Sequence, residues 1–142
     1  MGRVLAIDYG DRRVGLAVSD PDRLISFPRG FITWSGKREL MGKLAEFCRE
    51  NEIGTVVVGL PRSLNGEEGP RAQLTRKWAG ELQQTLKLEI SFWDERFSSR
   101  QAQREIHSMG ERVGKRKGRV DEIAASLLLQ SYLDYSANST ET

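Results

Sequence analysis

Residues 3–20 read RVLAIDYGDRRVGLAVSD, and this stretch decides the fold. Two largely apolar runs, residues 3–9 and 13–19, are separated by a short turn that contains glycine, which is the pattern of a β-hairpin. Asp8 lies at the end of the first run, where a carboxylate is costly to bury unless it is paired, hydrogen-bonded or bound to a cation. The stretch therefore predicts the start of a sheet and a functional acid at its edge.

The rest of the chain alternates strand and helix patterns. Apolar residues at helical spacing indicate four helices, and β-branched or alternating runs indicate three more strands. The predicted strands span residues 24–33, 55–60 and 88–93, and the predicted helices span residues 37–51, 70–87, 98–108 and 119–134. Pro28 removes a backbone donor, so the third strand is expected at a sheet edge. This order predicts an α/β fold, an RNase H-like mixed five-stranded sheet with helices on both faces.

Length and composition predict one domain over residues 1–135 and a polar, frayed tail over residues 136–142. The chain has 142 residues, 38% of them hydrophobic and 30% charged, as in an ordinary globular protein. No apolar run approaches the roughly 20 residues that span a bilayer, so no membrane partner is expected. A single cysteine, Cys48, excludes an internal disulfide framework and favours a cytoplasmic location.

Basic residues gather in one part of the chain. Residues 96–119 carry eight Arg or Lys against two Glu, a local charge of +6, whereas the rest of the chain carries −4. Such a block suits a nucleic-acid backbone, although a solvated helix and loop has the same composition. Residues 109–118 contain three glycines and no apolar period, which predicts a mobile basic loop that orders on a nucleic-acid strand. The candidate contacts are Arg96, Arg100, Arg112, Lys115, Arg116 and Lys117.

Further phosphate contacts are expected beside the hairpin. Arg13 follows the turn close to Asp8 and could neutralise a phosphate there. Its structural alternative is an ion pair with Asp11 or Asp20. The loop over residues 59–71 leads into a predicted helix N-terminus, whose backbone N–H groups suit an anion.

Three acids lie at the ends of elements that should meet. Asp8 ends the first strand, Glu95 follows the fifth, and Asp121 lies near the start of the final helix. If the first and fifth strands are parallel, their carboxyl ends share one edge of the sheet. Converging carboxylates repel one another unless a cation lies between them, and an open cluster of them suits Mg²⁺ or Mn²⁺. Such ions can activate water and stabilise the leaving oxygen when a phosphodiester is hydrolysed.

Each acid also has an ordinary structural interpretation. Asp8 could cap the turn, and Asp121 could cap the final helix. Glu95 could pair with a neighbouring arginine on the surface, where such pairs contribute little. Asp94 precedes Glu95, and the sequence does not decide which of the two is the ligand.

Four stretches resemble the YqgF family of RNase H-like proteins, whose members are named as Holliday junction resolvases or pre-16S rRNA nucleases. They read AIDYGDRRVGLAVSD, VVVGLPRSLNGEEG, FWDERFSS and GRVDEIAASLLLQSYLD, and they occur in the family's order across nearly all of residues 1–135. The resemblance implies that Asp8, Glu95 and Asp121 are both the catalytic residues and the metal ligands. The sequence differs in one respect from the related RuvC resolvases. They carry a catalytic glutamate on the fourth strand, and the fourth predicted strand of this chain has no acid. Glu95 must therefore reach the metal with its longer side chain.

The resemblance implies a hydrolase, a metal-dependent nuclease that processes the 5′ end of precursor 16S rRNA during ribosome biogenesis. Its expected cofactor is Mg²⁺ or Mn²⁺, and its expected partners are structured RNA, favoured over branched DNA, and pre-ribosomal particles. A monomer or weak homodimer is expected. The alternatives are a Holliday junction resolvase acting on branched DNA and a non-catalytic nucleic-acid-binding module. An actin-like ATPase shares the first motif but needs two lobes, which 142 residues do not provide.

Overall fold

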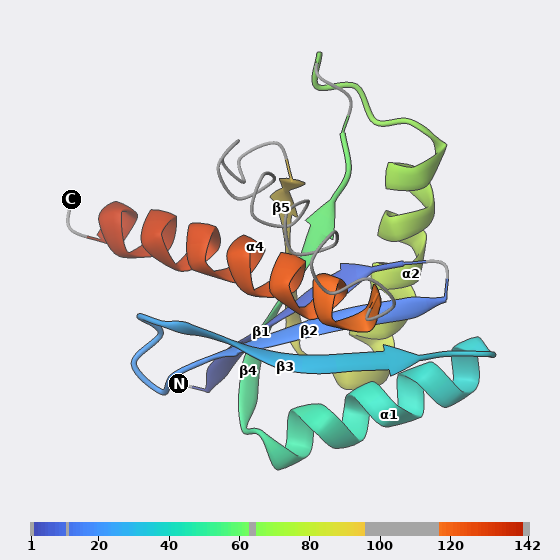
Figure 1. Cartoon of the computed structure of the whole chain (residues 1–142), viewed down its shortest axis with the longest axis horizontal. Coiled ribbons are helices and arrows are strands. Elements are labelled where there is room, and N and C mark those ends of the chain that lie inside the picture. The colour runs from blue at the N-terminus through green and yellow to red at the C-terminus, as the bar shows by residue number, and fades with distance from the viewer. Residues whose placement is uncertain (1, 11, 63–64, 96–116, 141–142) are drawn as a thin grey trace.

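The computed structural model describes residues 2–10, 12–62, 65–95 and 117–140. In this part of the chain it contains five strands and three helices in the predicted order (Figure 1). They are β1 (Arg3–Tyr9), β2 (Arg13–Ser19), β3 (Ser26–Thr33), α1 (Lys37–Glu50), β4 (Ile53–Leu60), α2 (Pro70–Leu86), β5 (Glu89–Asp94) and α4 (Lys117–Thr140). The helix predicted over residues 98–108 and most of the predicted basic loop lie outside the described residues.

The strands form one mixed sheet in the order β3-β2-β1-β4-β5, with β1 at its centre. β1 pairs antiparallel with β2 and parallel with β4, and β4 pairs parallel with β5. The carboxyl ends of β1, β4 and β5 therefore lie on one edge of the sheet. β3, which contains Pro28, is an edge strand as predicted.

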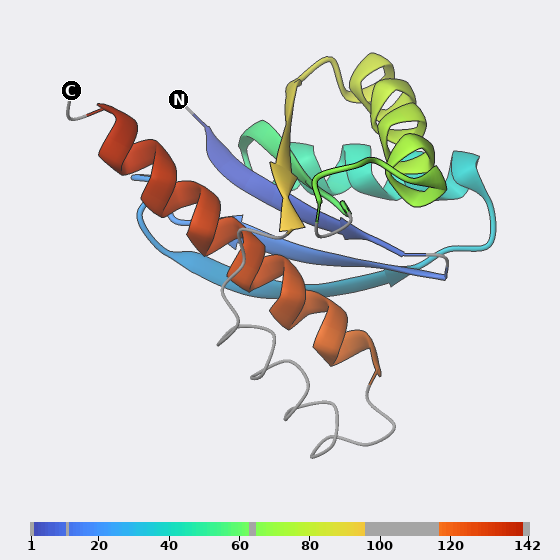
Figure 2. The same cartoon turned by 90° about the horizontal axis from the view of Figure 1, so that it is seen from above.

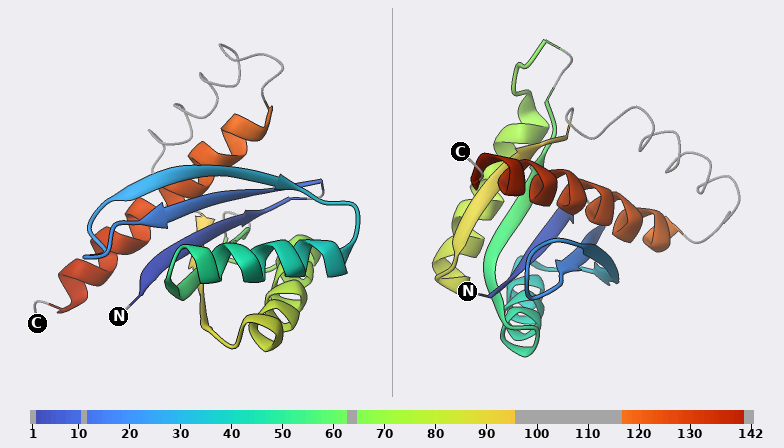
Figure 3. Two further views of the ribbon diagram at one scale, coloured as in Figure 1. Left: turned by 90° about the horizontal axis from the view of Figure 1, so that it is seen from below. Right: turned by 90° about the vertical axis from the view of Figure 1, so that its left-hand side faces the viewer.

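Helices cover both faces of the sheet, as the sequence predicts. Figure 2 shows α1 and α2 on one side and α4 on the other, and Figure 3 shows the same layers from below and from the side. Successive side chains along each strand point to opposite faces of the sheet, so each strand packs against both helical layers. In β1, Leu5 and Ile7 pack in the core with α1 and α2, whereas Ala6 packs in the core with α4. β4 is apolar toward both layers, which explains its continuous β-branched run.

The final helix is longer than the sequence predicts. α4 begins at Lys117 and ends at Thr140. The predictions of a loop through Lys117 and Gly118 and of a frayed tail from residue 136 to 140 are therefore wrong. From residue 119 onward the chain contains neither Gly nor Pro, so no residue there breaks the helix after the last apolar turn.

The remaining fold-level expectations concern the cysteine and the membrane. Cys48 is buried in α1, and burial raises the pKa of its thiol to about 11, so it packs as a small apolar residue. Within the described residues, every helix is too short or too polar to cross a membrane.

Candidate active site

The three acids that the sequence singles out lie at one edge of the sheet. Asp8 is the next-to-last residue of β1, Glu95 directly follows β5, and Asp121 lies one turn into α4. β1 and β5 run in the same direction on either side of β4, so their ends are near neighbours. The charges of Glu95 and Asp121 both act on Asp8. The structure thus brings the three predicted acids together.

Gly15 allows α4 to approach the acids. Gly15 of β2 pairs with Asp8 of β1, and a Cβ at this glycine would overlap the backbone carbonyl of Asp121. Any larger residue would therefore push the helix away from the sheet. The alternative that Asp121 caps the helix is wrong, because α4 begins four residues before it.

Asp8 and Glu95 form a hydrogen-bonded carboxyl pair in which Asp8 donates and Glu95 accepts. The pKa of Asp8 is raised from 3.8 to about 7, first by burial and then by the charges of Glu95 and Asp121. Burial also raises the pKa of Glu95 above its ordinary value. In the absence of a cation, Asp8 therefore holds its proton to a higher pH than an ordinary aspartate does. This is the response expected of acids that are arranged for a positive charge.

Gly59 explains how Glu95 reaches Asp8 from the outer strand. Gly59 belongs to β4, which lies between β1 and β5, and a Cβ at this position would lie 2.8 Å from Oε1 of Glu95. The same Cβ would overlap the side chain of Leu128 in α4. The absence of a side chain at Gly59 thus leaves room for the carboxylate of Glu95.

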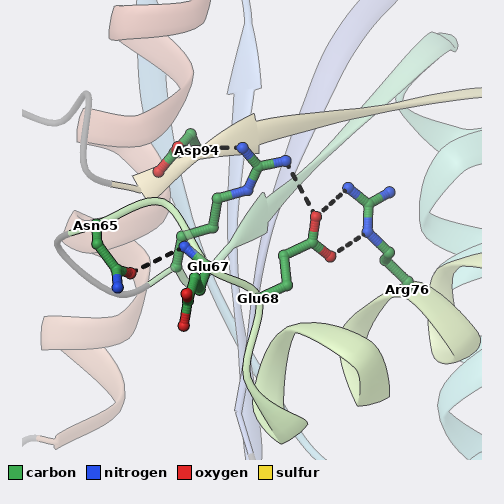
Figure 4. A network of polar contacts seen from close by, with 6 residues as sticks. Asn65, Glu67, Glu68, Arg76 and Asp94 are labelled. Carbon is green, nitrogen blue, oxygen red and sulfur yellow. Dashed lines mark hydrogen bonds and ion pairs between the residues drawn. The ribbon is translucent and has the colours of Figure 1, made fainter.

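Asp94 contacts other residues, and its neighbour Glu95 is the one that bonds Asp8. Its side chain is buried, and its Oδ2 lies 3.7 Å from Nη1 of Arg62. Arg62 donates to Glu68 at 3.1 Å, and Glu68 accepts two hydrogen bonds from Arg76 at 2.5 and 2.9 Å (Figure 4). The hydrogen bond from Arg76 is the main cause that holds the pKa of Glu68 below its ordinary value. The network ties the segment after β4 to the end of β5 and leaves Glu95 as the candidate ligand.

Two arginines accompany the acids. Arg13 donates from Nε to Oδ2 of Asp121 at 2.9 Å. This partner differs from both structural alternatives, because Asp20 accepts from backbone N–H groups of its own turn and Asp11 lies outside the described residues. The ion pair places Arg13 at the acids, where a phosphate contact was expected.

Arg71 is the second arginine, and the sequence reasoning missed it. From the first turn of α2, its Nη2 donates to the backbone carbonyl of Tyr9 at 3.0 Å. Its positive charge lowers the pKa of both Asp8 and Glu95. A signal was present, since Arg71 is the second residue of the helix that follows β4, at the same sheet edge as Asp8.

The donor set fits a hard divalent cation. Carboxylate oxygens are the ligands that Mg²⁺ and Mn²⁺ prefer, and the site presents those of Asp8 and Glu95 next to each other. In the part of the chain that the structure describes, no group of three or more His, Cys, Asp or Glu side chains is already arranged around one ion position. Asp121 is held by Arg13 in this arrangement. Three-acid coordination would need at least one carboxylate oxygen of Asp121 to face the ion.

The other predicted nucleic-acid contacts cannot be placed on this site. Arg96, Arg100, Arg112, Lys115 and Arg116 lie outside the described residues. Lys117 is described only in its backbone, as the first residue of α4. Their role stays a prediction from the sequence.

An RNase H-like sheet with converging carboxylates at the ends of its first and fifth strands defines the structural class of the protein. The model of the family described as "RuvX: Holliday junction resolvase" matches residues 2–135, and the chain belongs to this family. A relative from Roseiflexus, named "Putative pre-16S rRNA nuclease", is 36% identical over 94% of both chains. A relative of the same name from Acetivibrio thermocellus is 40% identical over 93% of this chain and 95% of its own.

Solved structures confirm the fold. RuvC from T. thermophilus, in complex with a Holliday junction substrate, aligns with a TM-score of 0.65 over 99% of this chain and 98% of its own, at 12% identity. The fowlpox virus resolvase in complex with Holliday junction DNA aligns with a TM-score of 0.55 over 94% of this chain and 98% of its own, also at 12% identity.

Proposed function

We propose that the protein is a metal-dependent endonuclease that hydrolyses phosphodiester bonds in RNA, at the 5′ end of precursor 16S rRNA. The observation that carries this proposal is the hydrogen-bonded pair of Asp8 and Glu95 beside Asp121, at a sheet edge that also holds two arginines. Membership of the RuvX family and the names of its relatives support it. We expect the protein to act in the cytoplasm on pre-ribosomal particles.

Each residue at this edge has a definable role in the proposed reaction. Asp8, Glu95 and Asp121 would hold Mg²⁺ or Mn²⁺, which when bound supplies an activated water and stabilises the leaving oxygen. Arg13 and Arg71 lie on either side of the acids and attract the phosphates of the strand, which the carboxylates alone would repel. Gly59 keeps the path of Glu95 open, so the acid pair stays aligned.

The test is cleavage of two substrates by the purified protein in Mg²⁺ or Mn²⁺. An RNA that carries the leader of precursor 16S rRNA should be cut, and a synthetic four-way DNA junction should remain largely intact. Asp8→Asn should be inactive on both. Wild-type rates in this variant at saturating metal would contradict the assignment of Asp8.

Cleavage of branched DNA is the second candidate, favoured by the family description and by the likeness to RuvC bound to a junction. Outside residues 96–119 the chain carries a net charge of −4, so it offers no broad positive surface for a junction. A junction has two-fold symmetry, so a resolvase should be a dimer that makes paired cuts. Paired nicking at rates that match or exceed RNA cleavage would reverse the ranking. No cleavage of either substrate in either metal would favour a non-catalytic binding module.

A further inference from the structure

A groove of about 810 Å³ lies where the ends of β4 and β5 face the second half of α4. Figure 1 and Figure 2 both show α4 next to the end of β5. Leu60 and Asp94 pair across these strands and line the groove. Leu60 directly follows Gly59, and Asp94 directly precedes Glu95. The groove therefore lies at the same edge of the sheet as the candidate active site, where β4 and β5 end.

An aromatic cluster forms one wall of the groove. Trp93 of β5 meets Tyr135 of α4 with ring centroids 5.3 Å apart, and Tyr132 meets the same tryptophan edge-on at 5.8 Å. Tyr135 lines the groove and is 60% exposed. Any of the four bases can stack on such a cluster, because every nucleobase has a π-face.

The charges of the groove select against a phosphate. Its ionisable lining residues are Arg62, Asp94 and Asp134, which together carry a net negative charge. Arg62 already faces two carboxylates, those of Asp94 and Glu68. The lining side chains nevertheless include both hydrogen-bond donors and hydrogen-bond acceptors, and the polar edge of a neutral base also presents both. The volume also lies within the range of about 300–1,000 Å³ typical of small-ligand sites.

We propose that this groove binds an unpaired nucleobase of the strand whose phosphate lies at Asp8 and Glu95. This proposal rests on the function proposed above and deepens it, because it makes an unpaired nucleotide in the same strand as the cleaved phosphate a requirement for recognition. A base held in a duplex cannot enter the groove without being unpaired and unstacked first. Tyr135 is the stacking residue, and the two arginines at the acids hold the backbone.

The test compares two ligands with equal numbers of phosphates, a fluorescein-labelled single-stranded RNA and a base-free ribose-phosphate chain of the same length. Affinities are measured by anisotropy in Mg²⁺ with the Asp8→Asn protein, so that the ligands stay intact. The protein should bind the RNA about 5- to 150-fold more tightly, the range of one base–aromatic stack. Tyr135→Ala should remove most of this preference without changing the affinity for the base-free chain, and Tyr135→Phe should retain it.

Phe27→Ala is the matched control, since Phe27 is an aromatic residue that is 48% exposed on β3, at the opposite edge of the sheet. It should change neither affinity. Equal weakening of both ligands by Tyr135→Ala, equal binding of both ligands before substitution, or equal effects of Tyr135→Ala and Phe27→Ala would each overturn the proposal. Cleavage of the leader RNA by the protein with Asp8 intact is measured in parallel. A base preference that depends on Tyr135 without any cleavage would refute the nuclease and leave the groove assignment standing.

Discussion

Replacement of Asp8 by Asn isolates the energetic cost of the acid pair in the metal-free protein. The pKa of Asp8 is about 7 in the folded state against 3.8 for an ordinary aspartate, chiefly because of burial. The folded state therefore binds this proton more tightly than the unfolded state does. Below pH 4, Asp8 is protonated in both states and does not lower the free energy of unfolding. As the pH rises from 4 to 7, this carboxyl lowers the free energy of unfolding progressively, and above pH 7 the loss is constant.

The magnitude follows from the same two pKa values. At about 1.4 kcal/mol per pKa unit, the difference between 3.8 and about 7 corresponds to roughly 4 kcal/mol. Asn is neutral at every pH and still donates a hydrogen bond to Glu95. We expect Asp8→Asn to match the wild type near pH 4 and to exceed it by up to about 4 kcal/mol above pH 7.5. At roughly 3 °C per kcal/mol, the melting temperature rises by about 12 °C.

The assay is urea unfolding in EDTA at intervals from pH 4 to pH 8.5. Asp20→Asn is the control with the opposite sign, because the backbone N–H groups of Ile25 and Leu24 hold the pKa of Asp20 below its ordinary value. Its stabilisation is present at neutral pH and disappears as the pH falls, so Asp20→Asn should be less stable than the wild type at pH 7. An Asp8→Asn protein that is no more stable than the wild type at pH 8, or whose advantage is independent of pH, would refute the reasoning.

Three further substitutions test the site. Arg71→Gln should weaken binding of single-stranded RNA and reduce its salt slope by about 1, whereas Lys77→Gln on the same helix should leave both unchanged; equal slopes for the two variants would contradict a phosphate contact. Gly59→Ala should lower the free energy of unfolding in urea by about 1–3 kcal/mol, because the added Cβ overlaps Leu128. It should also lower the cleavage rate about 100-fold by displacing Glu95. Full activity would show that the glycine is dispensable. Neutralising the basic loop should flatten the salt dependence of binding more than it slows cleavage of bound substrate, and an unaltered slope would show that the loop is merely solvated. The residues replaced together are Arg112, Lys115, Arg116 and Lys117.

The parts of the fold that depend on local patterns could be predicted from the sequence. The hairpin over residues 3–19 and the buried run over residues 55–60 each carry their own period, and Pro28 indicates the edge strand. α4 ends later than the periodicity predicts, because the polar residues after 134 lower apolar periodicity without breaking a helix. Periodicity reports which face is buried, and it does not report where an exposed helix stops.

The parts of the site that depend on tertiary approach could not be predicted. The acids were found because parallel strands bring their carboxyl ends to one edge. Whether Asp94 or Glu95 is the candidate metal ligand depends on Arg62. This arginine comes from the segment after β4 and forms an ion pair with Asp94. Arg71 comes from the layer opposite to α4 and contacts the end of β1. No spacing along the chain encodes either contact.

Gly59 and Glu95 are best understood as one structural unit. Neighbouring strands are about 4.8 Å apart, so an acid at the end of β5 must pass over β4 to meet an acid on β1. It can do so only where β4 presents no side chain on that face, and Gly59 is that position. A glutamate at 95 opposite a larger residue at 59 would be blocked, and a glycine at 59 without Glu95 would leave a gap under Leu128. The effects of substitutions at the two positions should therefore be strongly non-additive, because each residue has its function only in the presence of the other.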